Sequence, residues 1–365
     1  MSSSTIHPRR SASLQGVLWL APLFLLGILG YVGYLGLNAD ARPAPAVPNS
    51  SSSDYPLTVT EADGRKVVIP RKPMRIIATN AGMADILSVL IPPERIAAVP
   101  DTVDGFAGNT KYFAEHKEIK RFGKYQAEPL LALKPDLILS NSFQDSTTTD
   151  ILEKNGIPVL RFEYYKTMNS IRESVLIVGK AVGENEKARQ LVENFDARIA
   201  AVKIAVAGRP RPRVLSYSNY GQGYAVGVGE SQDEIITIAG AVNAAAEMNL
   251  KGHVHFTFEQ MLKLNPDWLI VSGEQGLNSP QIKILMNEPT LAQLPALKNN
   301  KVAVIPDNVY SSISHYVVDA IELLAKQLHP DAKFGLKWDC DPRVGSKLPL
   351  APQPTQHISE TDELK

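Results

Sequence analysis

The hydrophobic pattern of the folded region begins with two short segments of alternating polarity. Leu57–Thr60 and Lys66–Ile69 flank the pair Asp63-Gly64. An Asp-Gly pair tolerates the positive φ angles of a tight turn between two strands. The pattern therefore predicts a β-hairpin.

After the hairpin, short apolar runs alternate with longer amphipathic stretches. This alternation is typical of βαβ units built around a parallel sheet. The predicted strands are Arg75–Ala78, Ile96–Val99, Leu137–Leu139 and Pro158–Phe162, and the predicted helices are Met83–Leu90, Pro129–Leu133 and Thr149–Lys154. These elements predict a first lobe.

A long helical region without proline follows, from Asn169 to Ala207. Its apolar residues recur at helical intervals, and Gly183 is a candidate break or kink. The stretch after Gly183 would span roughly 36 Å at ~1.5 Å per residue, about the width of a domain. We expect this region to connect two lobes.

The strand and helix alternation then restarts, which predicts a second lobe. Its predicted strands are Val214–Tyr217, Trp268–Val271 and Val302–Ile305, and its predicted helices are Asp233–Ala239, Glu259–Leu264 and Val317–Leu328. The expected fold class is α/β, with two Rossmann-like lobes that have parallel sheets, are joined by a single long helix and hold a ligand cleft between them.

The segment Leu14–Leu37 is apolar and uncharged, and Arg9 and Arg10 precede it. It is longer than the core of a signal peptide and close to the ~20 residues that span a bilayer. The arginines place its N-terminal side in the cytoplasm. We expect a retained anchor; cleavage near Ala39-Asp40-Ala41 is the alternative, and both place the body outside the cytoplasm.

Composition excludes several classes of function. Lys plus Arg and Asp plus Glu both number 38, so no excess charge indicates a nucleic-acid partner. The single cysteine, Cys340, permits no intrachain disulfide and no thiolate cluster. The expected organisation is a cytoplasmic stub and anchor or signal peptide at 1–39, a linker rich in Pro, Ser and Ala at 40–56, an N-terminal lobe at 57–168, the connecting helix at 169–207, a C-terminal lobe at 208–334 and a flexible tail at 335–365.

The two lobes share an internal repeat. Glu128 and Glu259 each open a short helix, a proline seven residues later ends it, and an aspartate introduces a buried strand. The glutamates lie 131 residues apart in equivalent contexts. This recurrence indicates two related half-domains.

The chain resembles the periplasmic binding proteins in which one rigid helix joins the lobes and whose ligands include cobalamin, ferric siderophores and haem. The resemblance covers Leu57 to Phe334. Its marks are Val59-Thr60-Glu61-Ala62-Asp63-Gly64, Pro73-Met74-Arg75-Ile76-Ile77, Ala132-Leu133-Lys134-Pro135-Asp136-Leu137-Ile138, Asn155-Gly156-Ile157-Pro158-Val159, Gly179-Lys180-Ala181-Val182-Gly183 and Ile238-Ala239-Gly240-Ala241-Val242-Asn243.

The resemblance implies the substrate-binding component of an ABC importer. Such a protein captures a ferric siderophore, cobalamin or related metal chelate as a monomer and delivers it to an ABC permease dimer with its ATPase in the inner membrane. By position, Glu128 and Glu259 match the family's two glutamates that dock onto permease arginines. A glutamate in a first turn also simply favours the helix dipole, by about 0.3–1 kcal/mol.

Ligands of such folds lie beyond the carboxyl ends of the strands, so the loops there supply the candidate residues. They are rich in aromatic and neutral polar groups, which suits a ligand with a large organic surface, and they lack an arginine cluster. The candidate ligand-binding residues are Asn80, Phe106, Asn141, Phe143, Tyr164, Tyr165, Asn219, Tyr220, Tyr224, His253, His255 and Tyr310.

Other chemistry has less support. His253 and His255 alternate on an extended segment, and His315 and Glu274 could approach them, but the spacing favours a polar pocket or surface loop over a metal site. The run Gly221–Gly229 fails the dinucleotide and phosphate-loop patterns, so we expect a mobile turn beside the cleft. No nucleophile elbow or zinc-protease helix occurs, so neither an enzyme nor a cofactor is expected. A carrier of a free metal ion, a sensor and an enzyme on this scaffold remain as alternatives.

Overall fold

The computed structural model describes residues 55–61, 63–163, 166–219, 223–273 and 280–334. The chain divides after Ser51, and the unit that begins at Ser52 is the one described below. The predicted anchor at Leu14–Leu37, nearly all of the linker and the tail with Cys340 lie outside the described residues. Within those residues, no helix combines the length and the apolar character that crossing a bilayer requires.

The N-terminal lobe has a five-stranded parallel sheet in the order β5-β4-β3-β6-β7. The separate hairpin β1–β2 has the predicted bounds, and Gly64 at its turn has a φ of 85°. The strands are β1 (Leu57–Thr60), β2 (Lys66–Ile69), β3 (Ile76–Ala78), β4 (Ile96–Pro100), β5 (Lys120–Phe122), β6 (Leu137–Asn141) and β7 (Val159–Phe162). The helices are α2 (Ala81–Leu90), η1 (Pro93–Arg95), α3 (Val103–Phe106), α4 (Thr110–Glu115), α5 (Ala127–Ala132) and α6 (Ser146–Lys154).

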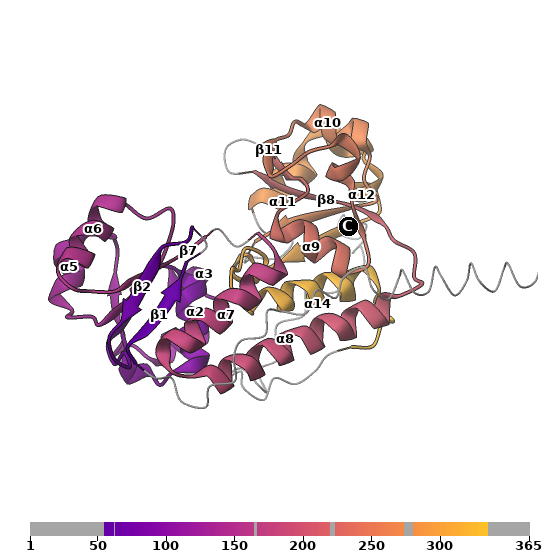
Figure 1. Ribbon diagram of the computed structural model, residues 1–365. Coiled ribbons are helices and arrows are strands. Elements are labelled where there is room, and N and C mark those ends of the chain that lie inside the picture. Colours follow the sequence, from indigo (N-terminus) through magenta and orange to yellow (C-terminus); the bar gives the residue numbers. More distant parts are fainter. Residues whose placement is uncertain (1–54, 62, 164–165, 220–222, 274–279, 335–365) are drawn as a thin grey trace, which may run out of the picture. The chain divides into compact units, whose positions relative to one another are not determined.

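Gly183 breaks the predicted connecting helix in two, giving α7 (Met168–Val182) and α8 (Asn185–Val206). Gly183 has a φ of 74°, a left-handed conformation that ends a helix at little steric cost. The two helices then pack closely, since a Cβ at Gly179 would lie 2.2 Å from Cβ of Ala188. The longer member, α8, has 22 residues and lies beside α14 in Figure 1.

The C-terminal lobe has a mixed sheet in the order β11-β9-β8-β12-β13, with β10 beside β8. Strands β8, β10, β12 and β13 are parallel, whereas β9 and β11 extend the sheet in an antiparallel arrangement that the sequence did not predict. The strands are β8 (Arg213–Asn219), β9 (Gly223–Val226), β10 (Val242–Asn243), β11 (His253–His255), β12 (Trp268–Ser272) and β13 (Val302–Ile305). The helices are α9 (Ser231–Ile238), η2 (Ala244–Met248), α10 (Phe258–Leu264), α11 (Pro280–Asn287), η4 (Pro289–Gln293), α12 (Pro295–Lys298), α13 (Asp307–Tyr310) and α14 (Val317–Leu328).

The expectation of a mobile turn over Gly221–Gly229 was wrong for the described part of that run. Gly223–Val226 forms β9 and pairs with both β8 and β11. Gly227 then passes so close to the next segment that a Cβ there would lie 2.2 Å from the carbonyl oxygen of Leu250. Gly227 is therefore needed because its backbone packs directly against that of Leu250.

Each sheet is covered by helices on both faces. In the N-terminal lobe, Ile76 faces a cluster that includes residues of α2 and α7, whereas Ile77 faces Leu130 of α5 and Leu152 of α6. This alternation follows from the period of two along a strand. In the C-terminal lobe the same division places α8, α9 and α14 on one face and α10, α11 and α12 on the other (Figure 1).

The segment 307–316, between β13 and α14, packs against the N-terminal lobe. Ser314 Oγ donates to Asp85 Oδ2 at 3.0 Å, and Asn109 Nδ2 donates to Tyr316 Oη at 3.2 Å. Two glycines allow this approach, because a Cβ at Gly82 would lie 2.3 Å from Ile313 and one at Gly108 would lie 2.4 Å from Tyr316. We call residues 307–316 the interlobe segment.

Candidate ligand-binding cleft

A cavity of about 140 Å³ lies where the interlobe segment meets the N-terminal lobe. Its walls come from three segments that each follow the carboxyl end of a parallel strand: α2 after β3, α3 after β4, and the interlobe segment after β13. This is the position at which doubly wound folds bind ligands. The lining residues are Ala81, Gly82, Asp85, Phe106, Asp307, Ser311, Ser312 and Ile313.

Asn80 lies at the start of α2, beside this cavity. Its Oδ1 accepts a hydrogen bond from the backbone N–H of Met83 at 2.9 Å, the N-cap geometry for which asparagine is preferred. Its Nδ2 is buried and has no hydrogen-bond partner among the described residues. Asn80 thus begins the helix, and its side-chain N–H group is left without an acceptor in the described part of the chain.

Two exposed phenylalanines flank this helix start. Phe106 is 60% exposed and Phe143 is 71% exposed. They follow β4 and β6, which pair with β3 on its two sides. Asn141 shapes the second loop, because its Oδ1 accepts from the backbone N–H of Phe143 at 3.0 Å. Phe106 lines the cavity, and large exposed apolar side chains at a cavity are typical of sites for organic ligands.

Two carboxylates line the same cavity. Asp85 is 1% exposed and accepts hydrogen bonds from the backbone N–H groups of Gly108 and Asn109, at 2.8 and 3.2 Å. Asp307 begins α13, and its Oδ1 is buried without a hydrogen-bond partner in the described part of the chain. Asp85 was not among the predicted site residues, and its one signal in the sequence is an acidic residue within the apolar stretch of α2.

Tyr310 was predicted to contact ligand, but the structure places it in the core. It is 4% exposed, and its hydroxyl donates to Oγ of Ser216 at 2.6 Å. Burial raises the pKa of this hydroxyl. The short helix α13 turns Tyr310 inward, whereas Asp307 on the same helix lines the cavity.

The histidine pair lies on an edge strand. His253 and His255 are both exposed on β11, and the ring of His255 meets that of Tyr224 edge to face at 6.0 Å. None of the three lines the cavity at the interlobe segment. Across the described residues, no group of three or more His, Cys, Asp or Glu side chains is arranged to hold a metal ion.

Several predicted residues cannot be placed in this geometry. Tyr164, Tyr165, Tyr220 and Glu274 lie outside the described residues, as does the side chain of Asn219. Their contact with ligand stays a prediction.

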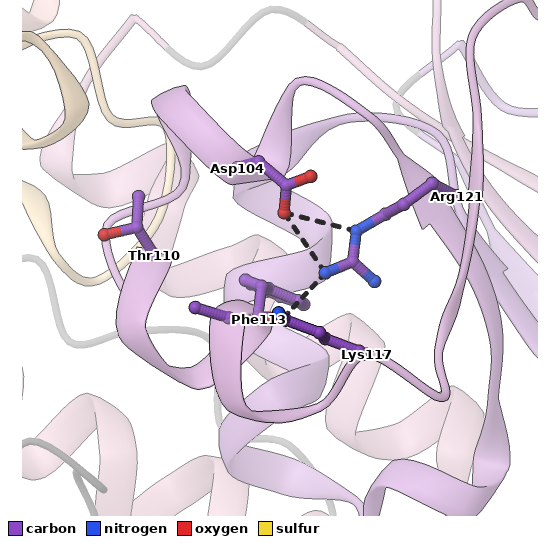
Figure 2. Close-up of a pocket in the computed structure, with 6 residues that line it drawn as sticks. Asp104, Thr110, Phe113, Lys117 and Arg121 are labelled. Atoms are coloured by element: carbon purple, nitrogen blue, oxygen red, sulfur yellow. Dashed lines mark hydrogen bonds and ion pairs between the residues drawn. The ribbon is translucent and has the colours of Figure 1, made fainter.

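A second cavity, of about 310 Å³, lies on the N-terminal lobe near α3 and α4 (Figure 2). Figure 2 shows the Arg121 guanidinium turned toward Asp104, to which its Nη2 donates at 3.1 Å, while the same nitrogen donates to the carbonyl oxygen of Phe113 at 2.7 Å. These bonds hold β5 against α3 and α4. Arg121 is therefore occupied by structural contacts.

The repeated glutamates occupy equivalent sites in the two lobes. Glu128 is the second residue of α5, and Glu259 is the second residue of α10. Both are exposed, and neither has a hydrogen bond or ion pair within the described residues. Each carboxylate is thus available to a partner.

The fold and the cleft define a two-lobed α/β binding protein. The chain belongs to the periplasmic binding protein family, whose model matches residues 76–309.

Known proteins with this fold bind several kinds of ligand. The ABC transporter substrate-binding lipoprotein YvrC of Bacillus subtilis, itself uncharacterized, is 23% identical over 332 residues, which cover 88% of this chain and 98% of the relative. A cobalamin-binding protein of Halobacterium salinarum is 21% identical over 300 residues, which cover 80% of each chain. The apo structure of the periplasmic haem-binding protein RhuT from Roseiflexus sp. RS-1 has a TM-score of 0.61 at 22% identity, covering 71% of this chain and 99% of RhuT.

Proposed function

We propose that this chain is the extracytoplasmic substrate-binding component of an ABC importer and that it captures an organic metal chelate, a ferric siderophore, a cobalamin or a related compound. The observation that carries the proposal is the exposed Phe106, which lines the cavity at the interlobe segment; Phe143, also exposed, lies on the loop after β6. A chelate with a broad organic surface would cover both rings. The names of the cobalamin-binding and haem-binding relatives support the same ligand class.

Delivery to the permease is the second part of the proposal. Glu128 and Glu259 each present an unpaired carboxylate from an equivalent helix, one in each lobe. Two charges held apart fix both position and orientation on a two-fold-related partner, and such pairing contributes more to register than to affinity. The partner is a permease dimer with its ATPase.

The setting follows from the N-terminal segment. We propose that Leu14–Leu37 anchors the chain in the cytoplasmic membrane and that the linker after it carries the two lobes outside. The family and the lipoprotein relative support an extracytoplasmic location. The body acts as a monomer that binds and releases its ligand without changing it.

The direct test is a binding screen of the full-length chain by isothermal titration calorimetry. The ligands are cyanocobalamin, ferrichrome, ferrioxamine B, haemin and the chlorides of divalent metals. We expect saturable binding of at least one chelate, no chemical change in the recovered ligand, and weaker binding in the double variant Phe106→Ala, Phe143→Ala. Binding of divalent ions alone, or turnover of a ligand, would contradict the proposal.

A further inference from the structure

The interlobe cavity is small and acidic. At about 140 Å³ it is below the ~300–1,000 Å³ of pockets that enclose whole small-molecule ligands. It has room for one substituent of a chelate, and the body of the chelate would rest outside, over Phe106. Its lining includes the carboxylates of Asp85 and Asp307, and none of the lining residues is basic.

Asp307 offers an acceptor that the described part of the chain does not use. Its Oδ1 is buried without a hydrogen-bond partner there. A buried acceptor left unsatisfied costs free energy, and a donor on a ligand removes that cost. A positively charged donor gains most, because charge-assisted hydrogen bonds are the stronger ones.

Asp85 places a second carboxylate at the same cavity and holds it still. The N–H groups of Gly108 and Asn109 and the hydroxyl of Ser314 all donate to it, so donors from both lobes fix its position. A cationic group that reaches Asp307 would therefore also feel the field of Asp85.

The N-terminal-lobe loops that follow β3, β4 and β6 carry the same sign of charge. These loops, 79–82, 101–109 and 141–145, contain Asp101, Asp104 and Asp145 and no lysine, arginine or histidine. Asp104 is paired with Arg121, whereas Asp145 caps α6 through the N–H of Thr148. Clefts lined by one sign of charge concentrate ligands of the opposite sign.

We infer that the interlobe cavity receives a positively charged substituent of the ligand, an ammonium or guanidinium arm, and that Asp307 is its ion-pair partner. The ligand class is then a cationic chelate rather than an anionic one. This inference rests on the proposed function of the cleft. It makes Asp307 a specificity-determining residue, and it distinguishes this chain from a protein that recognises carboxylates with arginines.

The test compares two ligands that differ only in this charge. Ferrioxamine B carries a free ammonium arm, and its N-acetylated form does not. By calorimetry with the full-length chain, we expect ferrioxamine B to bind at least about 10-fold more tightly than the acetylated form. Asp307→Asn should bring the ratio close to one by weakening only the cationic ligand, and Asp150→Asn, an exposed aspartate of α6, should leave it unchanged.

A second variant, Ser311→Lys, tests the inference independently in case Asp307→Asn does not fold. Ser311→Lys puts a cation into the same cavity and should weaken ferrioxamine B more than its acetylated form. Equal affinity for the two forms, or tighter binding of haemin with its propionates, would overturn the inference and leave the proposed function standing. Tight binding of calcium or zinc alone would overturn the proposed function and the inference together and would assign the cavity to a bare ion. Failure to bind any chelate would overturn the proposed function and the inference together.

Discussion

The repeated glutamates lie on α5 in one lobe and on α10 in the other. These two helices make the same contacts at their C-terminal ends and different ones at their N-terminal ends. At the C-terminal end of α5, Asp136 accepts from the backbone N–H of Arg75 at 2.8 Å, and the Arg75 guanidinium donates to the carbonyl of Leu133 at 2.7 Å. In the other lobe Asp267 accepts from the N–H of Arg213 at 2.8 Å. Arg213 then donates to the carbonyl of Leu264, also at 2.8 Å.

The N-terminal ends of the two helices differ. In α10, Thr257 and Gln260 form a reciprocal capping box. In α5, the cap residue Gln126 makes no side-chain hydrogen bond, and its third helical residue is Pro129, which has no N–H to donate. The feature that the two helices share is therefore the contact of the strand-entry aspartate and the arginine at the C-terminal end, which we call the clamp.

The largest expected effect comes from changing the repeated glutamates of both lobes at once. Replacing both Glu128 and Glu259 with arginine should abolish ligand uptake while leaving the dissociation constant unchanged, because neither carboxylate lines the interlobe cavity and both are proposed to dock onto the permease. Uptake of radiolabelled ligand in cells and calorimetry of the purified chain measure the two quantities. Glu193→Arg, on the exposed face of α8, is the control. Unchanged uptake, or lost affinity, would contradict docking.

The clamp of Asp136 and Arg75 should stabilise the fold more than that of Asp267 and Arg213. Asp136 receives hydrogen bonds from the N–H groups of both Met74 and Arg75, whereas Asp267 is more exposed and receives that of Arg213. These hydrogen bonds lie at the protein surface, where each contributes ~0.5–1.5 kcal/mol net. We expect Asp136→Ala to lower the free energy of unfolding by about 2 kcal/mol and Asp267→Ala by about 1 kcal/mol, measured by urea denaturation. Equal losses would show that the second donor contributes nothing.

The difference between the caps predicts a further asymmetry. Thr257→Ala should cost about 1 kcal/mol of unfolding free energy, the usual effect of losing an N-cap. Gln126→Ala should cost close to nothing, since its side chain makes no capping bond. Thermal unfolding of the two variants under one condition checks this, and a comparable loss in both would contradict it.

A residue swap tests the turn that follows each helix. Lys134 and Asn265 both precede proline with left-handed φ angles, of 50° and 48°. That conformation costs most residues ~1–2 kcal/mol, and asparagine tolerates it better. Lys134→Asn should therefore raise the free energy of unfolding by about 0.5 kcal/mol, and Asn265→Lys should lower it by a similar amount. Changes of the same sign in both variants would refute this account.

The smallest expected effect concerns an ion pair found in one lobe. Arg213 pairs with Glu247 at 2.6 Å, and Arg75 forms no ion pair within the described residues. The hydrogen bond from Arg213 lowers the pKa of Glu247, so the pair adds stability above the unfolded-state pKa and loses it as the pH falls through the folded-state value. Since the pair is largely exposed, Glu247→Gln should cost under ~0.5 kcal/mol at neutral pH. The difference from the parent chain should vanish in acid.

Elements with strong local patterns were predicted closely from the sequence. The hairpin and α14 have the predicted bounds, because Asp-Gly marks a turn and the apolar positions of α14 recur at helical spacing. Strands β9 and β11 were not predicted as members of the sheet, since the one opens on a glycine and the other has only three residues. Their pairing is decided by residues distant in the sequence.

The candidate cleft residues likewise include some that the local sequence pattern identifies and some that it does not. Asn80, Phe106 and Phe143 could be found because each follows a strand that its apolar run identifies. Asp85 could not, because its neighbours in α2 are apolar and its partners come from a loop and from the interlobe segment. Tyr310 was misplaced since nothing local shows which side of a one-turn helix faces the core.

The two glycines of the N-terminal lobe that touch the interlobe segment have a consequence for mutational tolerance. Gly82 and Gly108 lie so close to that segment that any side chain would act as a wedge between the lobes. In a saturation library scored by ligand capture, we expect both positions to reject even alanine, although neither has a side chain. Positions without a side chain would then rank beside the ligand-binding residues, because the gap between two lobes is set there to within the width of a methyl group.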